Sequence, residues 1–189
     1  MKPVRILLFC AVTLVMLIGS VEPFMNQRTL EDIDPGPGVT HVKKLSDYYP
    51  SLRGTVGDTD VFVLEGEEPG GCALIIGGTH PNEPAGYVTA RIIVEHFNVQ
   101  KGKLIVIPRA NNSAFTHTQP LEATPGKVEF TYNGKRMIVT IGSRLTNPVH
   151  QWPDPRIYKA AGIQVLSGSE QRNLNRAYPG NAGGTLTEK

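Results

Sequence analysis

Cysteine is scarce in this sequence, which has only Cys10 and Cys72 among its 189 residues. Cys10 lies in an apolar N-terminal run, so loss of that run would leave Cys72 alone and exclude an internal disulfide. Cys72 itself lies in an apolar stretch, where we expect a small buried hydrophobic residue. The sequence also lacks a serine elbow and a cysteine–histidine pairing, so it gives no support to a hydrolase with a serine or thiol nucleophile.

A block of basic residues is missing as well. The formal net charge is +2, and Lys2 and Arg5 account for both units because residues 1–20 contain no acidic residue. Without residues 1–20 the chain is therefore balanced near zero charge. Such a chain lacks the positive cluster that binds phosphates, so we expect no nucleic-acid partner.

Residues 1–20 have the pattern of an export signal. Lys2 and Arg5 precede an apolar run at residues 6–18, and small residues follow the run. This order is typical of a secretory signal. The run is shorter than the roughly 20 apolar residues of a membrane span, although an uncleaved membrane anchor remains the alternative. We therefore expect an exported protein, periplasmic or extracellular.

The length suits one folded domain after this signal. Residues 21–54 contain the turn-forming stretch Asp-Pro-Gly-Pro-Gly at positions 34–38 and few apolar clusters, so they are predicted to form an extended lead-in. Residues 55–189 are predicted to form the domain.

An alternation of apolar segments indicates an α/β fold. Residues 60–64, 72–76 and 103–107 are predicted strands, and the continuous apolar run at 72–76 is typical of a strand buried on both faces. Residues 84–97 are predicted to form a helix, with an apolar stripe of Val88, Ile92, Ile93 and Phe97. The order strand–helix–strand favours a parallel crossover, so we expect a mixed, mostly parallel sheet flanked by helices.

Residues 111–170 interrupt this alternation. Asn133 and Gly134 join two strand-like segments, and this dipeptide favours a two-residue hairpin turn because both positions adopt positive φ. A proline-rich stretch follows as far as residue 155. We predict an inserted β-hairpin and a long loop, and long loops of this kind are often functional.

Two polar clusters are the candidates for chemistry. Residues 77–83 read Gly-Gly-Thr-His-Pro-Asn-Glu between a predicted strand and a predicted helix, where open α/β sheets place ligands. Here His80 and Glu83 can reach one cation, and nitrogen and oxygen donors suit zinc. Residues 172–180 carry two arginines and two asparagines, which can hold a carboxylate. Each cluster alone would also fit an ordinary role: a strand-end histidine with a helix-start glutamate, or a polar surface loop.

Taken together, the clusters resemble the motifs of a known family. Residues 77–86 resemble the zinc motif of the succinylglutamate desuccinylase/aspartoacylase family, and residues 173–180 resemble its Asn-Leu-Asn-Arg motif. Residues 107–111 resemble the segment between them. The resemblance covers roughly residues 55–189 and implies the N-terminal part of a zinc-dependent deacylase domain with the zinc carboxypeptidase-like fold.

The resemblance implies that His80 and Glu83 are two ligands of one zinc ion. The family's third ligand is a histidine downstream of the second motif, and its catalytic glutamate follows later. Lys189 ends the sequence before either position. We therefore expect a domain that is incomplete at its C-terminus, in which two protein ligands hold zinc less firmly than three.

The resemblance also implies a substrate site. Asn175 and Arg176 would bind the substrate's carboxylate, and Arg176 would also polarise the scissile carbonyl. Arg144 resembles a further catalytic and substrate-binding arginine of the family, with Arg109 as its rival. The implied reaction is amide hydrolysis of an N-acyl amino acid or similar small carboxylate. The alternatives are a zinc carboxypeptidase acting on peptides or peptidoglycan stems, and an inactive fragment or non-catalytic module.

Overall fold

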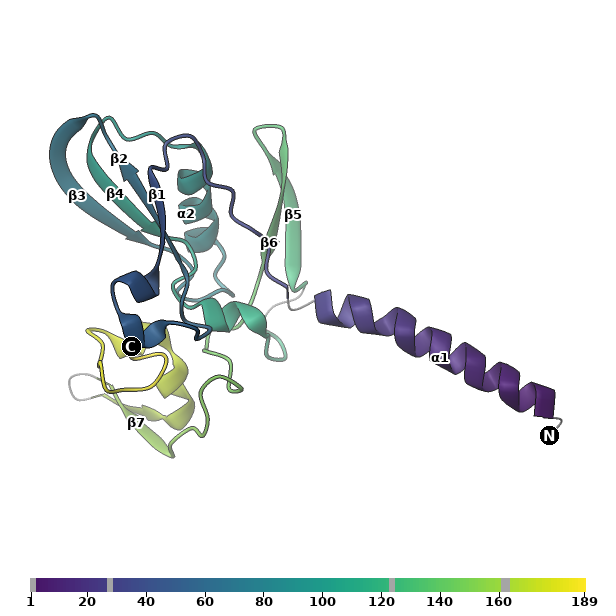
Figure 1. The fold of residues 1–189 in the computed structure, drawn as a ribbon. Helices are drawn as coiled ribbons and strands as arrows, with labels where there is room; N and C mark the ends of the chain where they lie inside the picture. The colour runs from purple at the N-terminus through teal and green to yellow at the C-terminus, as the bar shows by residue number, and fades with distance from the viewer. Residues whose placement is uncertain (1–2, 27–28, 123–124, 161–163) are drawn as a thin grey trace. The chain divides into compact units, whose positions relative to one another are not determined.

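A computed structural model describes residues 3–26, 29–122, 125–160 and 164–189 (Figure 1). The chain divides into two compact units, Met1–Leu30 and Glu31–Lys189. The first unit is built on one helix, and the second contains the sheet and both polar motifs. Each unit is described by itself.

Helix α1 (Pro3–Asn26) makes up most of the first unit. Its segment Pro3–Val21 has 19 residues and a mean hydropathy of 2.4, so it is long and apolar enough to cross a membrane. The apolar helix therefore extends beyond the predicted run at residues 6–18. A secretory signal and a membrane anchor both have this length and composition.

The second unit contains a four-stranded mixed sheet with the order β1-β2-β4-β3. Its strands are β1 (His41–Lys44), β2 (Asp60–Glu65), β3 (Glu68–Ile76) and β4 (Lys101–Ile107). Strand β3 pairs with β4 in parallel, and helix α2 (Ala85–His96) connects them, which confirms the predicted strand–helix–strand unit. The pairs β1–β2 and β2–β4 are antiparallel, so a mostly parallel sheet is not confirmed. Strand β1 lies in the segment that was expected to be an extended lead-in.

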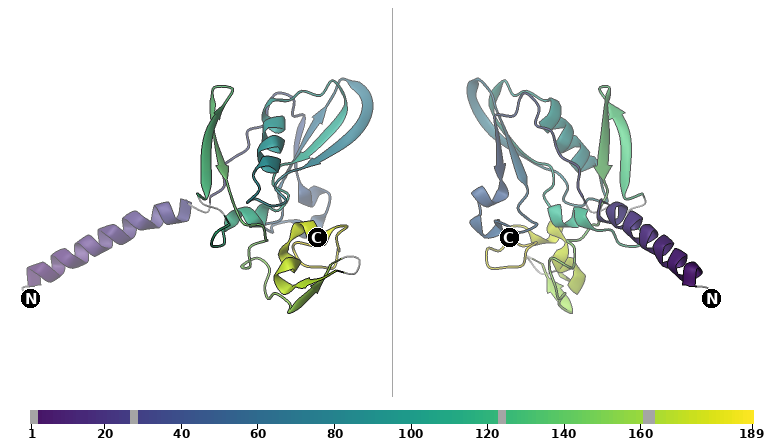
Figure 2. Two further views of the ribbon diagram at one scale, coloured as in Figure 1. Left: turned by 180° about the vertical axis from the view of Figure 1, so that it is seen from behind. Right: turned by 45° about the vertical axis from the view of Figure 1, so that its right-hand side comes forward.

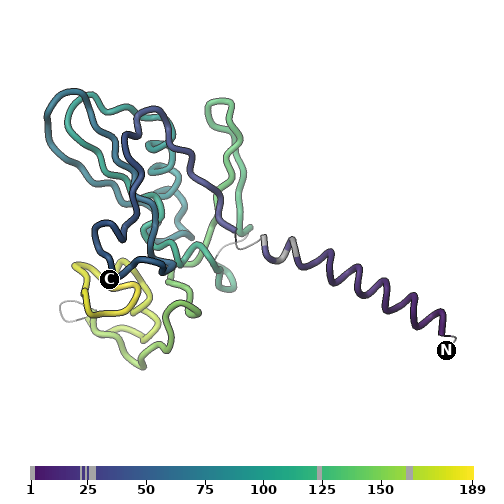
Figure 3. Tube along the Cα trace, in the orientation of Figure 1, coloured from purple at the N-terminus to yellow at the C-terminus, as the bar shows by residue number. Residues whose placement is uncertain are grey.

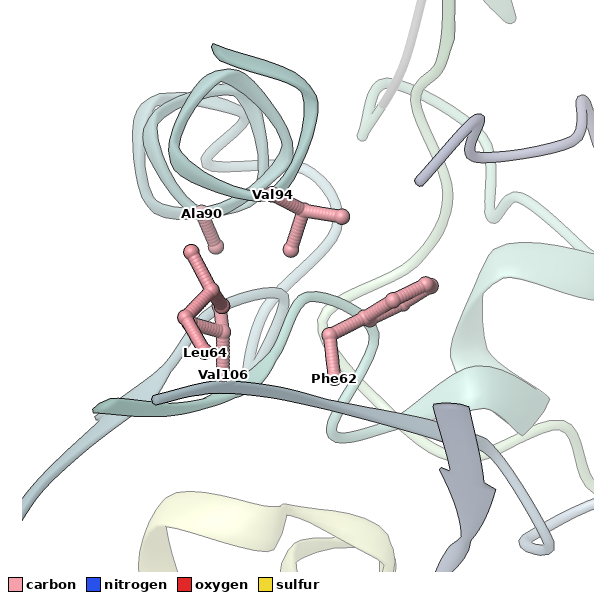
Figure 4. Close-up of a cluster of buried hydrophobic side chains, with 5 residues drawn as sticks. All are labelled: Phe62, Leu64, Ala90, Val94 and Val106. Carbon is pink, nitrogen blue, oxygen red and sulfur yellow. The ribbon is translucent and has the colours of Figure 1, made fainter. Parts of the chain in front are cut away.

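The main hydrophobic core lies between α2 and one face of this sheet (Figure 4). Alternate residues of a strand point to the same face, so Phe62 and Leu64 of β2 both reach the helix. Val106 of β4 is paired with Phe62 and joins them. On α2, Ala90 and Val94 are one turn apart and complete the cluster.

The buried side of α2 differs from the predicted stripe. The buried helix residues are Tyr87, Ala90, Arg91, Val94 and Glu95, whereas Phe97 is 51% exposed. The helix is covered on two sides, because a hairpin of β5 (Lys127–Tyr132) and β6 (Lys135–Thr140) lies on the side away from the sheet (Figure 2). The Arg91 guanidinium donates to the Ile138 carbonyl of this hairpin at 2.6 Å and to Glu95 at 2.7 Å. A polar strip on α2 is therefore buried.

A second expectation was wrong: residues 72–76 were predicted to form a strand buried on both faces, but strand β3 is largely exposed. Leu74 is 56% exposed and Ile76 41% exposed, and Cys72 is an exposed free cysteine. The reason is position: β3 is an edge strand of the described sheet. It also begins earlier than predicted, at Glu68, with an irregular register before Cys72.

The predicted hairpin is confirmed as β5 (Lys127–Tyr132) and β6 (Lys135–Thr140). Asn133 and Gly134 have φ angles of 47° and 75°, as a two-residue turn of this type requires. The region after it contains two short strands that the sequence did not predict, β7 (Ile157–Lys159) and β8 (Val165–Ser167), which pair antiparallel.

Short helical turns complete the second unit. They are η1 (Leu45–Asp47), η2 (Pro50–Leu52), η3 (Asn112–Thr116), η4 (Gly168–Arg172) and α3 (Leu174–Ala177). The last segment of the chain returns to the turns that follow β1 (Figure 3), where the Tyr49 hydroxyl donates to the Ala182 carbonyl at 2.7 Å.

Candidate functional site

The first motif begins in a tight turn at the end of β3. The amide of Gly77 donates to the Ile107 carbonyl of β4 at 2.8 Å, which continues the parallel ladder by one bond. Gly78 has a φ of 64°, and a Cβ atom there would lie 2.6 Å from the Pro108 carbonyl oxygen. Glycine is therefore needed at this position. The turn places His80 just beyond the carboxyl ends of the two parallel strands.

His80 and Glu83 lie side by side. Nδ1 of His80 is 3.2 Å from Oε1 of Glu83, and the Glu83 amide donates to the His80 carbonyl at 2.9 Å. The His80 side chain is 9% exposed and that of Glu83 71% exposed. One nitrogen and one oxygen donor therefore meet at the opening of the turn.

The other nitrogen of His80 contacts the second motif. Its Nε2 lies 2.8 Å from Oδ1 of Asn173, which is fully buried. The Asn173 amide is oriented by its neighbours: Oδ1 also accepts from the Asn175 backbone amide at 3.1 Å, and Nδ2 donates to Glu170 Oε2 at 2.7 Å. An amide oxygen only accepts, so His80 must carry a proton on Nε2. In the neutral ring, Nδ1 then keeps its lone pair and faces Glu83.

These two donors fit one zinc ion in part. Zinc binds imidazole nitrogen and carboxylate oxygen at about 2.1 Å, so two such ligands of one ion are roughly 3 to 3.5 Å apart. The 3.2 Å between His80 Nδ1 and Glu83 Oε1 agrees with this. Within the described ranges, no group of three or more His, Cys, Asp or Glu side chains could hold a metal. A catalytic zinc has three protein ligands, so the described residues provide an incomplete set.

Two of the predicted arginines converge beside Asn173. A terminal nitrogen of Arg144 is 3.8 Å from Glu170 Oε2, and Nε of Arg176 is 3.7 Å from the same oxygen. Their side chains are 40% and 33% exposed, respectively, so both can meet a ligand. The hydrogen-bonded series Glu170–Asn173–His80 joins this pair of arginines to the candidate metal ligands.

Arg172 holds the Arg144 loop next to the second motif. Its guanidinium contacts both carboxylate oxygens of Asp154, at 2.8 and 3.1 Å, and donates to the Thr146 carbonyl at 2.6 Å. The Thr146 amide in turn donates to the Arg172 carbonyl at 2.8 Å. Arg172 is buried, so it supports these two loops from within and is shielded from a ligand.

Arg109 takes part in a different network. It is 9% exposed, its guanidinium donates to the Tyr87 hydroxyl at 2.8 Å, and it lies 3.3 Å from the Glu31 carboxylate. The Arg109 guanidinium also stacks 5.1 Å from the centre of the Tyr87 ring. Among the described contacts, Arg144 and not Arg109 accompanies Arg176.

Asn175 is exposed, and its contact within the site is the hydrogen bond that its backbone amide donates to Asn173. The contacts instead single out Asn173 and Glu170, to which the sequence gave no separate role. Asn173 has a recognisable signal, because asparagine is favoured immediately before a helix and its side chain caps α3. Glu170 lies three residues earlier, and its contact with Asn173 depends on the turn η4.

Comparisons with known proteins give a weak structural likeness. No protein-family model matches the sequence, and no curated protein matches it. A crystal structure of a succinylglutamate desuccinylase/aspartoacylase from Rhodobacter sphaeroides is similar with a TM-score of 0.38 and 17% sequence identity. The likeness covers 69% of this chain and 26% of that one, so this chain spans about a quarter of that protein.

Proposed function

We propose that the chain carries the cation-binding and carboxylate-binding parts of a zinc-dependent hydrolase of the succinylglutamate desuccinylase/aspartoacylase type. Its reaction would be cleavage of the amide bond of an N-acyl amino acid or a similar small carboxylate. The observation that carries the proposal is the 2.8 Å contact between His80 and Asn173, because it joins two motifs that are 93 residues apart.

In this proposal His80 and Glu83 hold the metal, and Asn173 keeps the Nδ1 lone pair of His80 directed at it. When bound, zinc would supply an activated water and polarise the scissile carbonyl. Arg144 and Arg176 orient the substrate by its carboxylate, with Asn175 at the open side. Arg176 would also stabilise negative charge that develops on the carbonyl oxygen.

The two-donor set favours a second candidate, a non-catalytic module that binds a metal or a small carboxylate. Two protein ligands bind zinc less firmly than three, and they leave more of its coordination to solvent. A zinc carboxypeptidase would use the same metal and arginine residues as the first candidate, but its substrate would be a peptide.

Metal content and hydrolysis of the full chain test these candidates together. The zinc-loaded protein is dialysed and its metal measured for the unaltered chain, for His80→Ala, and for His41→Ala as a matched control on exposed β1. The hydrolase is supported if the unaltered chain retains stoichiometric zinc and releases the acyl group from N-acetyl amino acids, and if H80A loses the zinc. Cleavage of short peptides instead would favour the carboxypeptidase. Zinc without hydrolysis supports the module, and zinc retained equally by H80A contradicts both metal proposals.

The proposed location is outside the cytoplasm, in the periplasm or beyond the cell, with membrane anchoring as the alternative. Support comes from α1, which has the length and apolar character of a signal or an anchor. Mass spectrometry of the exported protein distinguishes the two, because a cleaved signal removes about 20 residues and an anchor retains them. Recovery of the intact chain from the cytosol would contradict both.

A further inference from the structure

Glu170 occupies a specific place between the two arginines of the candidate carboxylate site. Its Oε2 lies 3.8 Å from a terminal nitrogen of Arg144 and 3.7 Å from Nε of Arg176, and it accepts a 2.7 Å hydrogen bond from Asn173. The Nε atoms of both arginines are buried without a hydrogen-bond partner in the described part of the chain. Glu170 therefore partly neutralises the two arginines, while the Nε–H donor of each guanidinium stays without a hydrogen-bond partner among the described residues.

The formal charges of this group determine what it can bind. The three side chains, two guanidinium groups and one carboxylate, leave one net positive charge. The Glu122 carboxylate, which accepts a 3.3 Å hydrogen bond from the Arg144 backbone amide, adds further negative charge near Arg144. The arginine side chains are 40% and 33% exposed, against 21% for Glu170, so a ligand meets the cations first. One ligand carboxylate would balance the remaining charge. A second carboxylate would find no uncompensated cation and would be repelled by Glu170.

We propose that Glu170 makes Arg144 and Arg176 select ligands with one carboxylate over ligands with two. The proposal deepens the proposed function and rests on it for the hydrolytic step alone, because an arginine binds a carboxylate without zinc. The substrate class would then be an N-acyl amino acid in which the acyl group and the side chain are both uncharged. Glu170 would be a specificity-determining residue.

Butyrate and succinate are suitable probes, because they share a four-carbon chain and differ by one carboxylate. Each is titrated into the full chain at pH 7, low ionic strength and with a chelator present, and Kd is followed by chemical shifts or calorimetry. The unaltered chain is expected to bind butyrate at least as tightly as succinate. Glu170→Gln keeps an oxygen for Asn173 but removes the charge, so it is expected to shift the preference toward succinate by about tenfold.

Two further variants make the test decisive. Glu129→Gln removes the same charge from the exposed hairpin, where Glu129 pairs with Arg136, and should leave the preference unchanged. Arg144→Gln cancels the net positive charge and should weaken butyrate binding about tenfold, which tests the charge argument even if E170Q does not fold.

The same preference in E170Q and the unaltered chain, or no binding of either acid to any of these proteins, would overturn the proposal. Because the measurement uses neither zinc nor hydrolysis, its failure is distinguishable from a failure of the metal-binding and hydrolytic parts of the proposed function.

Discussion

Glu31 is the residue whose ionisation we expect to matter most for stability. Its carboxylate accepts hydrogen bonds from the Tyr87 hydroxyl of α2 at 2.7 Å, and from the amide and hydroxyl of Thr140 in β6 at 3.0 and 2.5 Å. One side chain thus joins α2, the hairpin and the segment before β1. We predict that Glu31→Gln destabilises the second unit, because it removes the charge at nearly constant size.

The magnitude follows from the pKa of Glu31. Burial raises this pKa, but the hydrogen bonds from Thr140 and Tyr87 outweigh burial and lower it from 4.5 to about 2. The side chain is 11% exposed, so solvent screening is limited. The difference between the two values corresponds to about 3 kcal/mol of unfolding free energy. Because the folded pKa is the lower one, this stability is present above pH 4.5 and is lost as the pH falls toward 2.

Urea denaturation of the full chain at several pH values measures this effect. At pH 7 the E31Q variant should unfold with a free energy lower by about 3 kcal/mol, and the two proteins should converge near pH 2. Glu129→Gln is the control, because Glu129 is exposed on the same hairpin and should change stability little. Equal stability of E31Q and the unaltered chain at pH 7, or a difference that does not shrink in acid, would refute the reasoning.

Two other substitutions test the framework of the candidate site. Gly78→Ala forces alanine into positive φ, 2.6 Å from a carbonyl oxygen, and should lower the unfolding free energy by about 2 kcal/mol or more; Gly71→Ala, which meets no atom within 4 Å, should change it much less. Arg172→Lys cannot keep the two-point contact with Asp154 and should cost about 2 kcal/mol, whereas Arg136→Lys on the exposed hairpin should cost little. Thermal unfolding of each pair measures the difference, and equal losses within a pair would contradict the prediction.

Local patterns in the sequence predicted the local elements well. Strand β2, strand β4 and the extent of α2 follow from apolar runs and helical spacing, and the hairpin turn follows from Asn133 and Gly134. These features depend on residues close in sequence. The wrong expectations concern neighbours in space: β3 is at the edge of the described sheet, and α2 is covered on two sides.

The candidate site divides in the same way. The neighbourhood of His80 and Glu83 follows from a three-residue spacing within one turn, which the sequence contains. The contact of His80 with Asn173, and the position of Glu170 between two arginines, depend on how separate loops meet. The spacing of His80 and Glu83 therefore predicted their proximity directly. The second motif was recognised only by its resemblance to a family, and its contacts with His80 were not predicted.

If His80 binds a metal as proposed, its hydrogen bond to Asn173 would also couple metal affinity to folding. It spans 93 residues, so chain entropy opposes it until the sheet and the final segment have both formed. The histidine tautomer that favours Nδ1 coordination is thus a property of the folded chain, and the unfolded chain has no such preference. A ligand that binds only this folded form must stabilise the docking of the final segment by the same free energy. Zinc affinity would then report how firmly that segment is held, even for substitutions far from His80.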